Sequence, residues 1–231
     1  MSLLALVLAA ALAAVHVFAA RVRLSMVPRS VWLSVAGGVS VSYVFVHLLP
    51  ELHADNGAVA ERFGAAVGFV EHHLYLVALL GFVGFHVLEQ RAKNRDEGSW
   101  LFGLHVAAFG VYNALVGYLL VHHDLPGPAS RILYATALGL HLLVNDHALA
   151  HHYPSSYHRA GRWVLAAAVL AGAAVGTLGA VDAAFVNLGF AVVAGATVLN
   201  AIKEELPEAR SSRSWAFVLG AAGYAALLVA I

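Results

Sequence analysis

The stretch that decides the fold is Thr136-Ala-Leu-Gly-Leu-His-Leu-Leu-Val-Asn-Asp-His-Ala-Leu-Ala-His-His-Tyr-Pro154, which carries polar residues through an otherwise apolar run. At about 100° per residue, one helix face contains His141, Asn145, Ala148 and His152, and a neighbouring face contains Val144, His147 and His151. Five of these seven residues are polar. Such side chains are costly at membrane depth unless they face a bundle interior or a water-filled path, so the stretch predicts a functional site.

The composition of the whole chain is typical of an integral membrane protein. Its 231 residues are 61% hydrophobic and 11% charged, and the mean hydropathy is +0.80, which lies outside the range of ordinary soluble domains. Cysteine is absent, so any metal ligand must be a histidine, a carboxylate, an amide or water. The 13 basic residues form no block, and nucleic acid is not an expected partner.

Apolar runs long enough to cross a hydrocarbon core of about 30 Å recur along the chain. Eight are expected, at about 3–20, 31–50, 70–90, 100–121, 130–152, 162–181, 184–205 and 214–231. The sequence therefore predicts an all-α fold of eight transmembrane helices in a single transmembrane domain, 1–231. Basic residues follow the first run instead of preceding it, which favours an uncleaved span over a signal peptide.

The distribution of basic residues predicts the orientation. Counted on alternate sides of the eight spans, Lys and Arg number eleven on one side, while the other side has only Arg62 and Arg131. By the positive-inside rule the first side is cytoplasmic. Both termini are then expected outside, in a multi-pass protein of the plasma membrane.

An internal repeat is also predicted. Gly38 stands twelve residues before Pro50, and Gly195 stands twelve before Pro207; each proline lies in the tripeptide Leu-Pro-Glu at the end of a span. The second and seventh spans run in opposite directions, as in an inverted repeat of helices 1–3 and 6–8 around helices 4–5. Coincidence remains an alternative, because Leu-Pro-Glu is short.

Two motifs resemble a known family of transporters. His47-Leu-Leu-Pro-Glu51 closes the second span, and Ala194-Gly-Ala-Thr197 leads to Glu205-Leu-Pro-Glu208 at the end of the seventh. With eight spans and outside termini, this layout is similar to the ZIP metal transporters (Zrt/Irt-like proteins). The resemblance implies a metal path between spans 2, 4, 5 and 7, with a centre formed by a His-Asn-x-x-Glu-Gly motif on span 4 and a His-Glu-x-Pro-His-Glu type motif on span 5. It also implies a homodimer.

The chain departs from both family motifs. Span 4 has Tyr112-Asn113-Ala-Leu-Val116-Gly117, and span 5 has His141-Leu-Leu-Val-Asn-Asp146. The ligand set that the resemblance implies is reduced to His141, Asn113 and Asn145, with Tyr112 and Asp146 as helpers. Because amide oxygens are neutral, we expect at most one weakly held divalent cation here, and transport of another substrate stays open.

A second group of histidines is expected toward the inner side. His105 and His147 each lie about six residues, or roughly 9 Å, inward of their span centres, and His147 forms an i, i+4 pair with His151. We therefore expect an inner polar cluster of His105, His147 and His151. The other reading of a lone intramembrane histidine is an interhelical hydrogen bond, which we favour for His16, His72, His73 and His86, and which stays open for His141.

Polar residues at the span ends are candidates for the two mouths of a path. His47 and Glu51 are the expected entry residues, and Glu204, Glu205 and Glu208 the expected exit residues. The alternative is that these carboxylates are ordinary polar helix ends at the membrane interface.

Two functions follow from the sequence. The first is a ZIP-like carrier that moves a divalent transition-metal cation, zinc before others, toward the cytoplasm through a degenerate centre. The second is a ZIP-fold membrane protein that does not transport and acts as a metal-binding or partner-binding subunit. No enzyme is predicted, because no general base stands beside a closed ligand set. No organic cofactor is expected, although the 14 histidines permit a di-haem protein.

Overall fold

Helices form the regular structure throughout the described part of the chain. The computed structural model describes residues 3–21, 29–54, 74–93, 98–122, 127–179, 181–200 and 213–230. Within these ranges no residue is in a strand, so the predicted all-α fold is confirmed. When the joined segments 29–54 and 154–178 are each counted as one unit, the described helices form eight units, one for each expected span.

The bounds of the helices refine the expected ones. In chain order they are α1 Leu3–Phe18, α2 Arg29–Tyr43, α3 Leu49–Ala54, α6 Leu74–Lys93, α7 Gly98–His122, α8 Gly127–His152, α9 Pro154–Ser156, α10 Arg162–Leu178, α11 Ala183–Asn200 and α12 Ser214–Val229. A π-helical segment, Val44–Leu48, joins α2 to α3, and a second one, Tyr157–Gly161, joins α9 to α10. The sixth helical unit therefore starts near Pro154, earlier than expected, because proline is well tolerated in the first turn of a helix.

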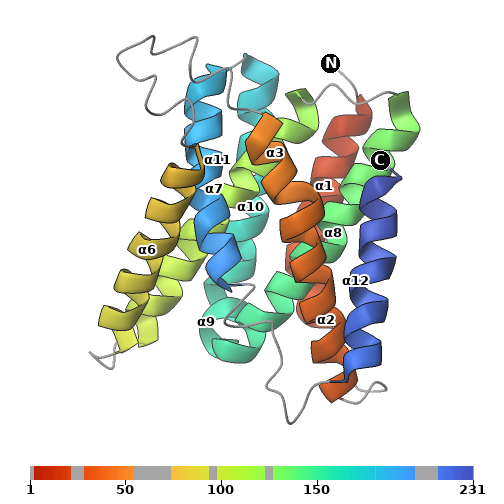
Figure 1. The fold of residues 1–231 in the computed structure, drawn as a ribbon. Helices are drawn as coiled ribbons and strands as arrows, with labels where there is room; N and C mark the ends of the chain where they lie inside the picture. Colours follow the sequence, from red (N-terminus) through yellow and green to blue (C-terminus); the bar gives the residue numbers. More distant parts are fainter. Residues whose placement is uncertain are drawn as a thin grey trace.

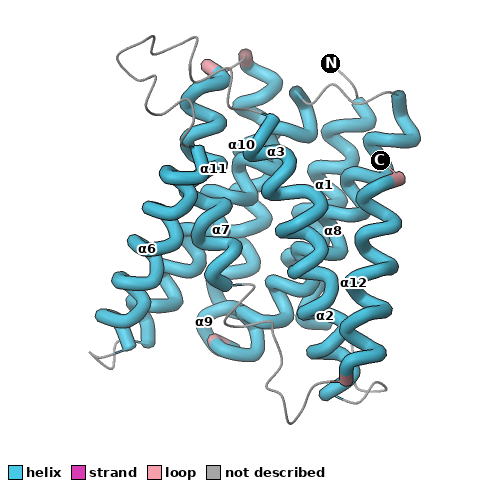
Figure 2. Tube along the Cα trace, viewed as in Figure 1, coloured by secondary structure: helices cyan, strands magenta, loops and turns pink. Residues whose placement is uncertain are grey.

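The helices lie side by side as a bundle. α12 packs along α2, α11 packs along α6, and α7 packs along α10, while α1 lies against both α10 and α8. Figure 1 shows α6 and α12 at opposite edges, with α7, α8 and α10 between them. The tube view in Figure 2 shows described loop residues at the two ends of the bundle.

Glycines set the close approach of α2 and α12. A Cβ on Gly38 would overlap the backbone carbonyl oxygen of Phe217 and the backbone nitrogen of Ala221. In the other direction, a Cβ on Gly220 would overlap the carbonyl oxygen of Val35. Small residues at such contacts let two helix backbones touch.

The pair formed by α6 and α11 repeats this arrangement. A Cβ on Gly195 would overlap the carbonyl oxygen of Ala78 and the backbone nitrogen of Phe82. A Cβ on Gly81 would overlap the carbonyl oxygen of Val192. In each pair, one glycine, Gly38 or Gly195, faces two residues that are four positions apart on the neighbouring helix. The glycine of that neighbouring helix, Gly220 or Gly81, faces the residue three positions before Gly38 or Gly195.

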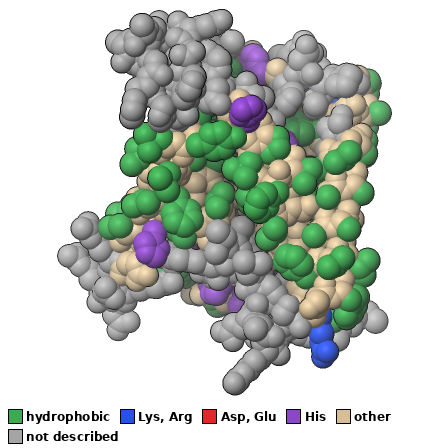
Figure 3. All heavy atoms as spheres, in the orientation of Figure 1, with side chains coloured by type: hydrophobic (Ala, Val, Ile, Leu, Met, Phe, Trp, Pro, Cys, Tyr) green, Lys and Arg blue, Asp and Glu red, His purple; other side chains and the backbone are tan. Residues whose placement is uncertain are grey.

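The outside of the bundle is strongly apolar. Leu79, Leu80 and Val83 of α6 are exposed, as are Trp215 and Leu219 of α12. Figure 3 shows that hydrophobic side chains cover much of the described surface on one face. Among the described helices, 100–122 and 154–178 are long and apolar enough to cross a membrane, and five others are apolar but shorter. Core helices of soluble proteins can meet the same length and composition criteria.

Candidate functional site

Five polar side chains are buried where α1, α7 and α8 meet. His16 of α1, Asn113 of α7 and three residues of α8, His141, Asn145 and Asp146, are each 6% exposed or less. The α8 residues lie within two helical turns, and the i, i+4 spacing of His141 and Asn145 places those two on one face. Of the polar stripe predicted on α8, His141 and Asn145 are therefore buried in the protein interior, whereas His151 and His152 are exposed.

His16 joins the three helices. Its Nδ1 lies 2.7 Å from Oδ2 of Asp146, and its Nε2 lies 2.8 Å from Oδ1 of Asn113. The amide nitrogen of Asn113 donates to the carbonyl oxygen of Phe109 at 2.8 Å. That bond fixes the amide so that its oxygen accepts from the Nε2–H of His16.

A proton must lie between His16 and Asp146. Since Nε2 donates to Asn113, Nδ1 is the atom that faces the carboxylate oxygen. The pair is therefore an imidazolium with a carboxylate, or its neutral tautomer, and its net charge is zero in both forms. A buried carboxylate is tolerated only when it is paired in this way. The second oxygen, Oδ1 of Asp146, is buried and has no hydrogen-bond partner.

Tyr157 fixes the backbone at His16. Its hydroxyl donates to the carbonyl oxygen of His16 at 3.0 Å, and its side chain is fully buried. Tyr157 begins the π-helical segment Tyr157–Gly161. Short π-helical turns inside helices occur frequently at functional sites.

Aromatic rings form the other half of the site. The ring of His141 stacks on Tyr43, with centroids 3.9 Å apart, and meets Tyr112 edge-on at 6.1 Å. The hydroxyls of Tyr43 and Tyr112 are hydrogen-bonded to each other. Asn145 donates from Nδ2 to Nε2 of His141 at 3.1 Å. The ring of His141 then carries its hydrogen on Nδ1, which is buried without a partner.

His47 continues this half toward α3. It lies in the π-helical segment Val44–Leu48, with its ring 5.2 Å from that of Tyr43 and 5.6 Å from that of Tyr134. The predicted entry residue is thus connected to His141 through Tyr43. Glu51 belongs to α3, but its side chain is not described.

The expected exit residues, Glu204, Glu205 and Glu208, lie outside the described residues.

The inner cluster expected from His105, His147 and His151 is not assembled. Among the described residues, no three His, Asp or Glu side chains are grouped so that they could hold a metal ion. The reason is that His105 has different neighbours from His147 and His151, although those two remain close enough to interact electrostatically. His105 donates from Nδ1 to the carbonyl oxygen of Leu101, and the ring of His147 meets that of Trp32 on α2.

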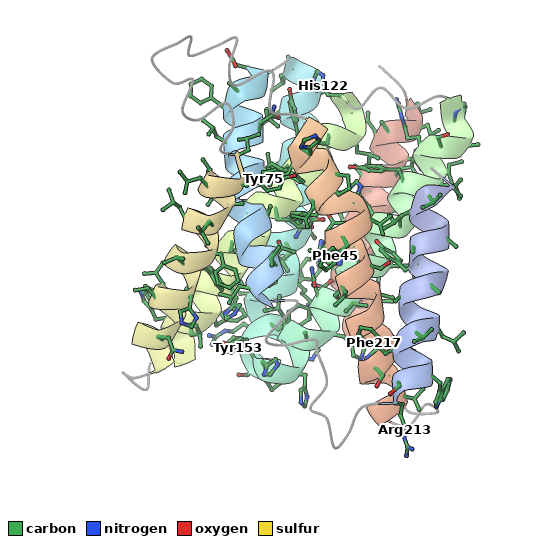
Figure 4. The ribbon with its side chains drawn as sticks, viewed as in Figure 1. Phe45, Tyr75, His122, Tyr153, Arg213 and Phe217 are labelled. Carbon is green, nitrogen blue, oxygen red and sulfur yellow. The ribbon has the colours of Figure 1, made fainter. Side chains whose placement is uncertain are left out.

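The ring contacts of His105 and His151 also differ from each other. The ring of His105 packs against Phe85 of α6 and against Tyr153, which Figure 4 shows near α9 at one end of the bundle. His151 is exposed, and its ring lies next to that of His152. The sequence indicates how deep each histidine lies along its helix. The direction of each side chain depends on how the helices pack.

Sequence reasoning missed three residues of this site. The sequence predicts an interhelical hydrogen bond for His16, which its bonds to α7 and α8 confirm, but it does not predict the carboxylate partner. A signal existed, because His16 and Asp146 are ionisable residues in two apolar runs and can compensate each other only by pairing. Tyr43 and Tyr157 gave no such signal, since tyrosine is common in apolar helices.

The chain matches no family model, no curated protein and no solved structure.

Proposed function

We propose that the protein is a ZIP-like membrane carrier that moves a divalent transition-metal cation, with zinc as the first candidate, toward the cytoplasm. The observation that supports it is the pair of buried polar groups, His16 with Asn113 and Asp146, and His141 with Asn145, inside a bundle of apolar helices. Polar side chains at membrane depth mark substrate and ion pathways.

The donor types in the network are compatible with a borderline divalent cation. Imidazole nitrogen suits zinc and similar metals, and carboxylate and amide oxygens suit harder ions. Asp146 is the one buried carboxylate among the described residues. A site with a single acid compensates only half the charge of a divalent ion, so the cargo would be held weakly, as a carrier requires.

The membrane setting and the inverted repeat belong to this proposal. The apolar outer surface supports insertion in a bilayer. The glycine contacts of α2 with α12 match those of α11 with α6, with Gly38 in the place of Gly195 and Gly220 in that of Gly81. An inverted repeat relates the first three of the eight helical units to the last three. It therefore requires the contact between α2 and α12 to recur between α11 and α6.

A specific observation favours the second candidate, a protein of this fold that does not transport and instead binds a metal or a partner. Asn113 and Asp146 are already hydrogen-bonded to His16, and the hydroxyl of Tyr112 is bonded to Tyr43. Three members of the set implied by the family resemblance are thus engaged with His16 and Tyr43, two residues outside that set.

Uptake into proteoliposomes separates the two candidates. Zinc, manganese, iron and cobalt are offered in turn to wild type, to His141→Ala and to His122→Ala. His122 is an exposed histidine at the other end of the bundle from α9 (Figure 4). A carrier gives saturable uptake of at least one metal, which His141→Ala lowers about 10- to 100-fold and His122→Ala leaves unchanged. If no metal enters above the rate of empty liposomes, the carrier is rejected and the second candidate stands.

A further inference from the structure

His16 occupies the groups of α7 and α8 that a cation would need. Its two ring nitrogens lie 2.7 Å from Oδ2 of Asp146 and 2.8 Å from Oδ1 of Asn113. Both distances are those of full hydrogen bonds. A metal ion cannot coordinate these two oxygens while the imidazole lies between them, because both would require the same space.

The carboxylate keeps one oxygen uncommitted. Oδ1 of Asp146 is buried and has no hydrogen-bond partner, although a buried acceptor without a partner costs about 1–3 kcal/mol. The Asp146 side chain is completely buried and His16 is 1% exposed, and the Tyr157 hydroxyl lies close enough to interact with the carboxylate. The centre therefore holds a carboxylate with one oxygen bonded to His16 and the other without a hydrogen bond of ordinary length.

We propose that His16 is an intramolecular occupant of the cation site: it holds Asp146 and Asn113 in the closed state and must leave them before a cation binds. This inference rests on the proposed function, because it assigns a regulatory residue to the same centre. The imidazole leaves by rotating its side chain or by moving with the last turn of α1. The second route breaks the bond from the Tyr157 hydroxyl to the carbonyl oxygen of His16.

The position of His16 in the fold is consistent with this role. It lies in the last turn of α1, a helix that packs on α10 and α8. Its contacts are therefore made across helix boundaries, where small relative movements of helices change them. The hydroxyl bond between Tyr43 and Tyr112 lies next to the same centre, since Tyr112 directly precedes Asn113. The closed state is thus held by bonds among α1, α2, α7 and α8.

The proposal predicts a gain of metal affinity when His16 is removed. If the open state is populated at about 1–10% in wild type, the apparent affinity is reduced about 10- to 100-fold, and removal of the occupant restores it. Purified full-length protein in detergent is equilibrated with Zn²⁺, and bound zinc is measured by elemental analysis. His16→Ala and His16→Gln should bind Zn²⁺ about 10- to 100-fold more tightly than wild type.

Two further variants make the result specific. His16→Ala/Asp146→Asn should lose the added affinity, because the carboxylate is the ligand that His16 covers. His122→Gln, which changes an exposed histidine, should bind as wild type does. Because an unfolded chain with 14 histidines can itself bind Zn²⁺, the gain must belong to the folded protein: Zn²⁺ should raise the unfolding temperature of His16→Ala more than that of wild type.

The proposal is overturned if neither His16 variant binds Zn²⁺ more tightly than wild type, or if Asp146→Asn leaves the gain intact. Its failure can be told apart from that of the carrier proposal. A gain that depends on Asp146 in a protein without any metal uptake would support the occupant and reject transport. Uptake by wild type together with unchanged binding by both His16 variants would support transport and reject the occupant.

Discussion

At the scale of single residues, the interior is stabilised by groups that satisfy each other across helix boundaries. His16 and Asp146 are hydrogen-bonded to each other, and Asn113 accepts the remaining ring hydrogen. Each of these groups would be costly to bury alone, since an isolated polar group loses its bonds to water. In the proposed carrier, these contacts would also decide which groups a cation can reach.

The hydroxyl pair of Tyr43 and Tyr112 gives a prediction at this scale. Tyr43→Phe and Tyr112→Phe should each lower the free energy of unfolding by about 1–3 kcal/mol, because each leaves one buried hydroxyl unpaired. In the double variant the free energy of unfolding should fall by less than the two single losses added together. The reason is that no buried hydroxyl is then left unpaired. Thermal unfolding in detergent, followed by circular dichroism, measures this.

The control for this pair is Tyr75→Phe, which changes a tyrosine that is 44% exposed and should have little effect. Strictly additive losses in the double variant would show that the two hydroxyls do not depend on each other.

At the scale of helices, glycine contacts decide which helices can pack closely. Gly38 and Gly195 sit where a Cβ would overlap the backbone of a neighbouring helix, whereas around Gly84 and Gly223 nothing lies within 4 Å of such a Cβ. Phe217, which Figure 4 places where α12 borders α2, supplies one of the overlapped backbone oxygens. Backbone atoms cannot turn away as side chains can, so the whole helix must shift.

Four alanine substitutions test this packing. Gly38→Ala and Gly195→Ala should each destabilise the bundle by about 1–3 kcal/mol through overpacking. Gly84→Ala and Gly223→Ala should be neutral or stabilising by up to about 1 kcal/mol, because alanine is the better helix former. The unfolding temperature of each variant in detergent is the measurement. Equal effects at all four positions would contradict the assignment of close contacts to the first two.

At the scale of the whole molecule, the proposed orientation follows from charge and from the alternation of the helices. Ser155, in α9, and Gly179, after α10, are separated by one helical unit and so lie at its opposite ends. If that unit crosses the membrane, one position is cytoplasmic and the other external. The positive-inside count places Ser155 inside.

The absence of cysteine makes this topology directly testable. Ser155→Cys and Gly179→Cys, introduced one at a time, are exposed to a membrane-impermeant maleimide on intact cells. Gly179→Cys should be labelled, and Ser155→Cys should be labelled only after the cells are opened. Labelling of Ser155→Cys alone on intact cells would reverse the orientation, and labelling of both would argue against a membrane crossing between them.

The amino-acid sequence by itself determined the helices and the polar stripe of α8. Both follow from local properties, namely the length of apolar runs and the 3.6-residue period that puts His141 and Asn145 on one face. The matching spacing of Gly38 and Gly195 also pointed to equivalent positions, where the structure shows equivalent contacts.

Only the tertiary structure decided what the polar residues do. The partner of Asp146 is His16, 130 residues away in the sequence, and His105 faces Phe85 and not His147. Which faces meet depends on how the helices pack, and that depends on close contacts such as those of Gly38 and Gly195. Periodicity gives the face of a helix on which a side chain lies, whereas only the assembled bundle determines which group lies opposite.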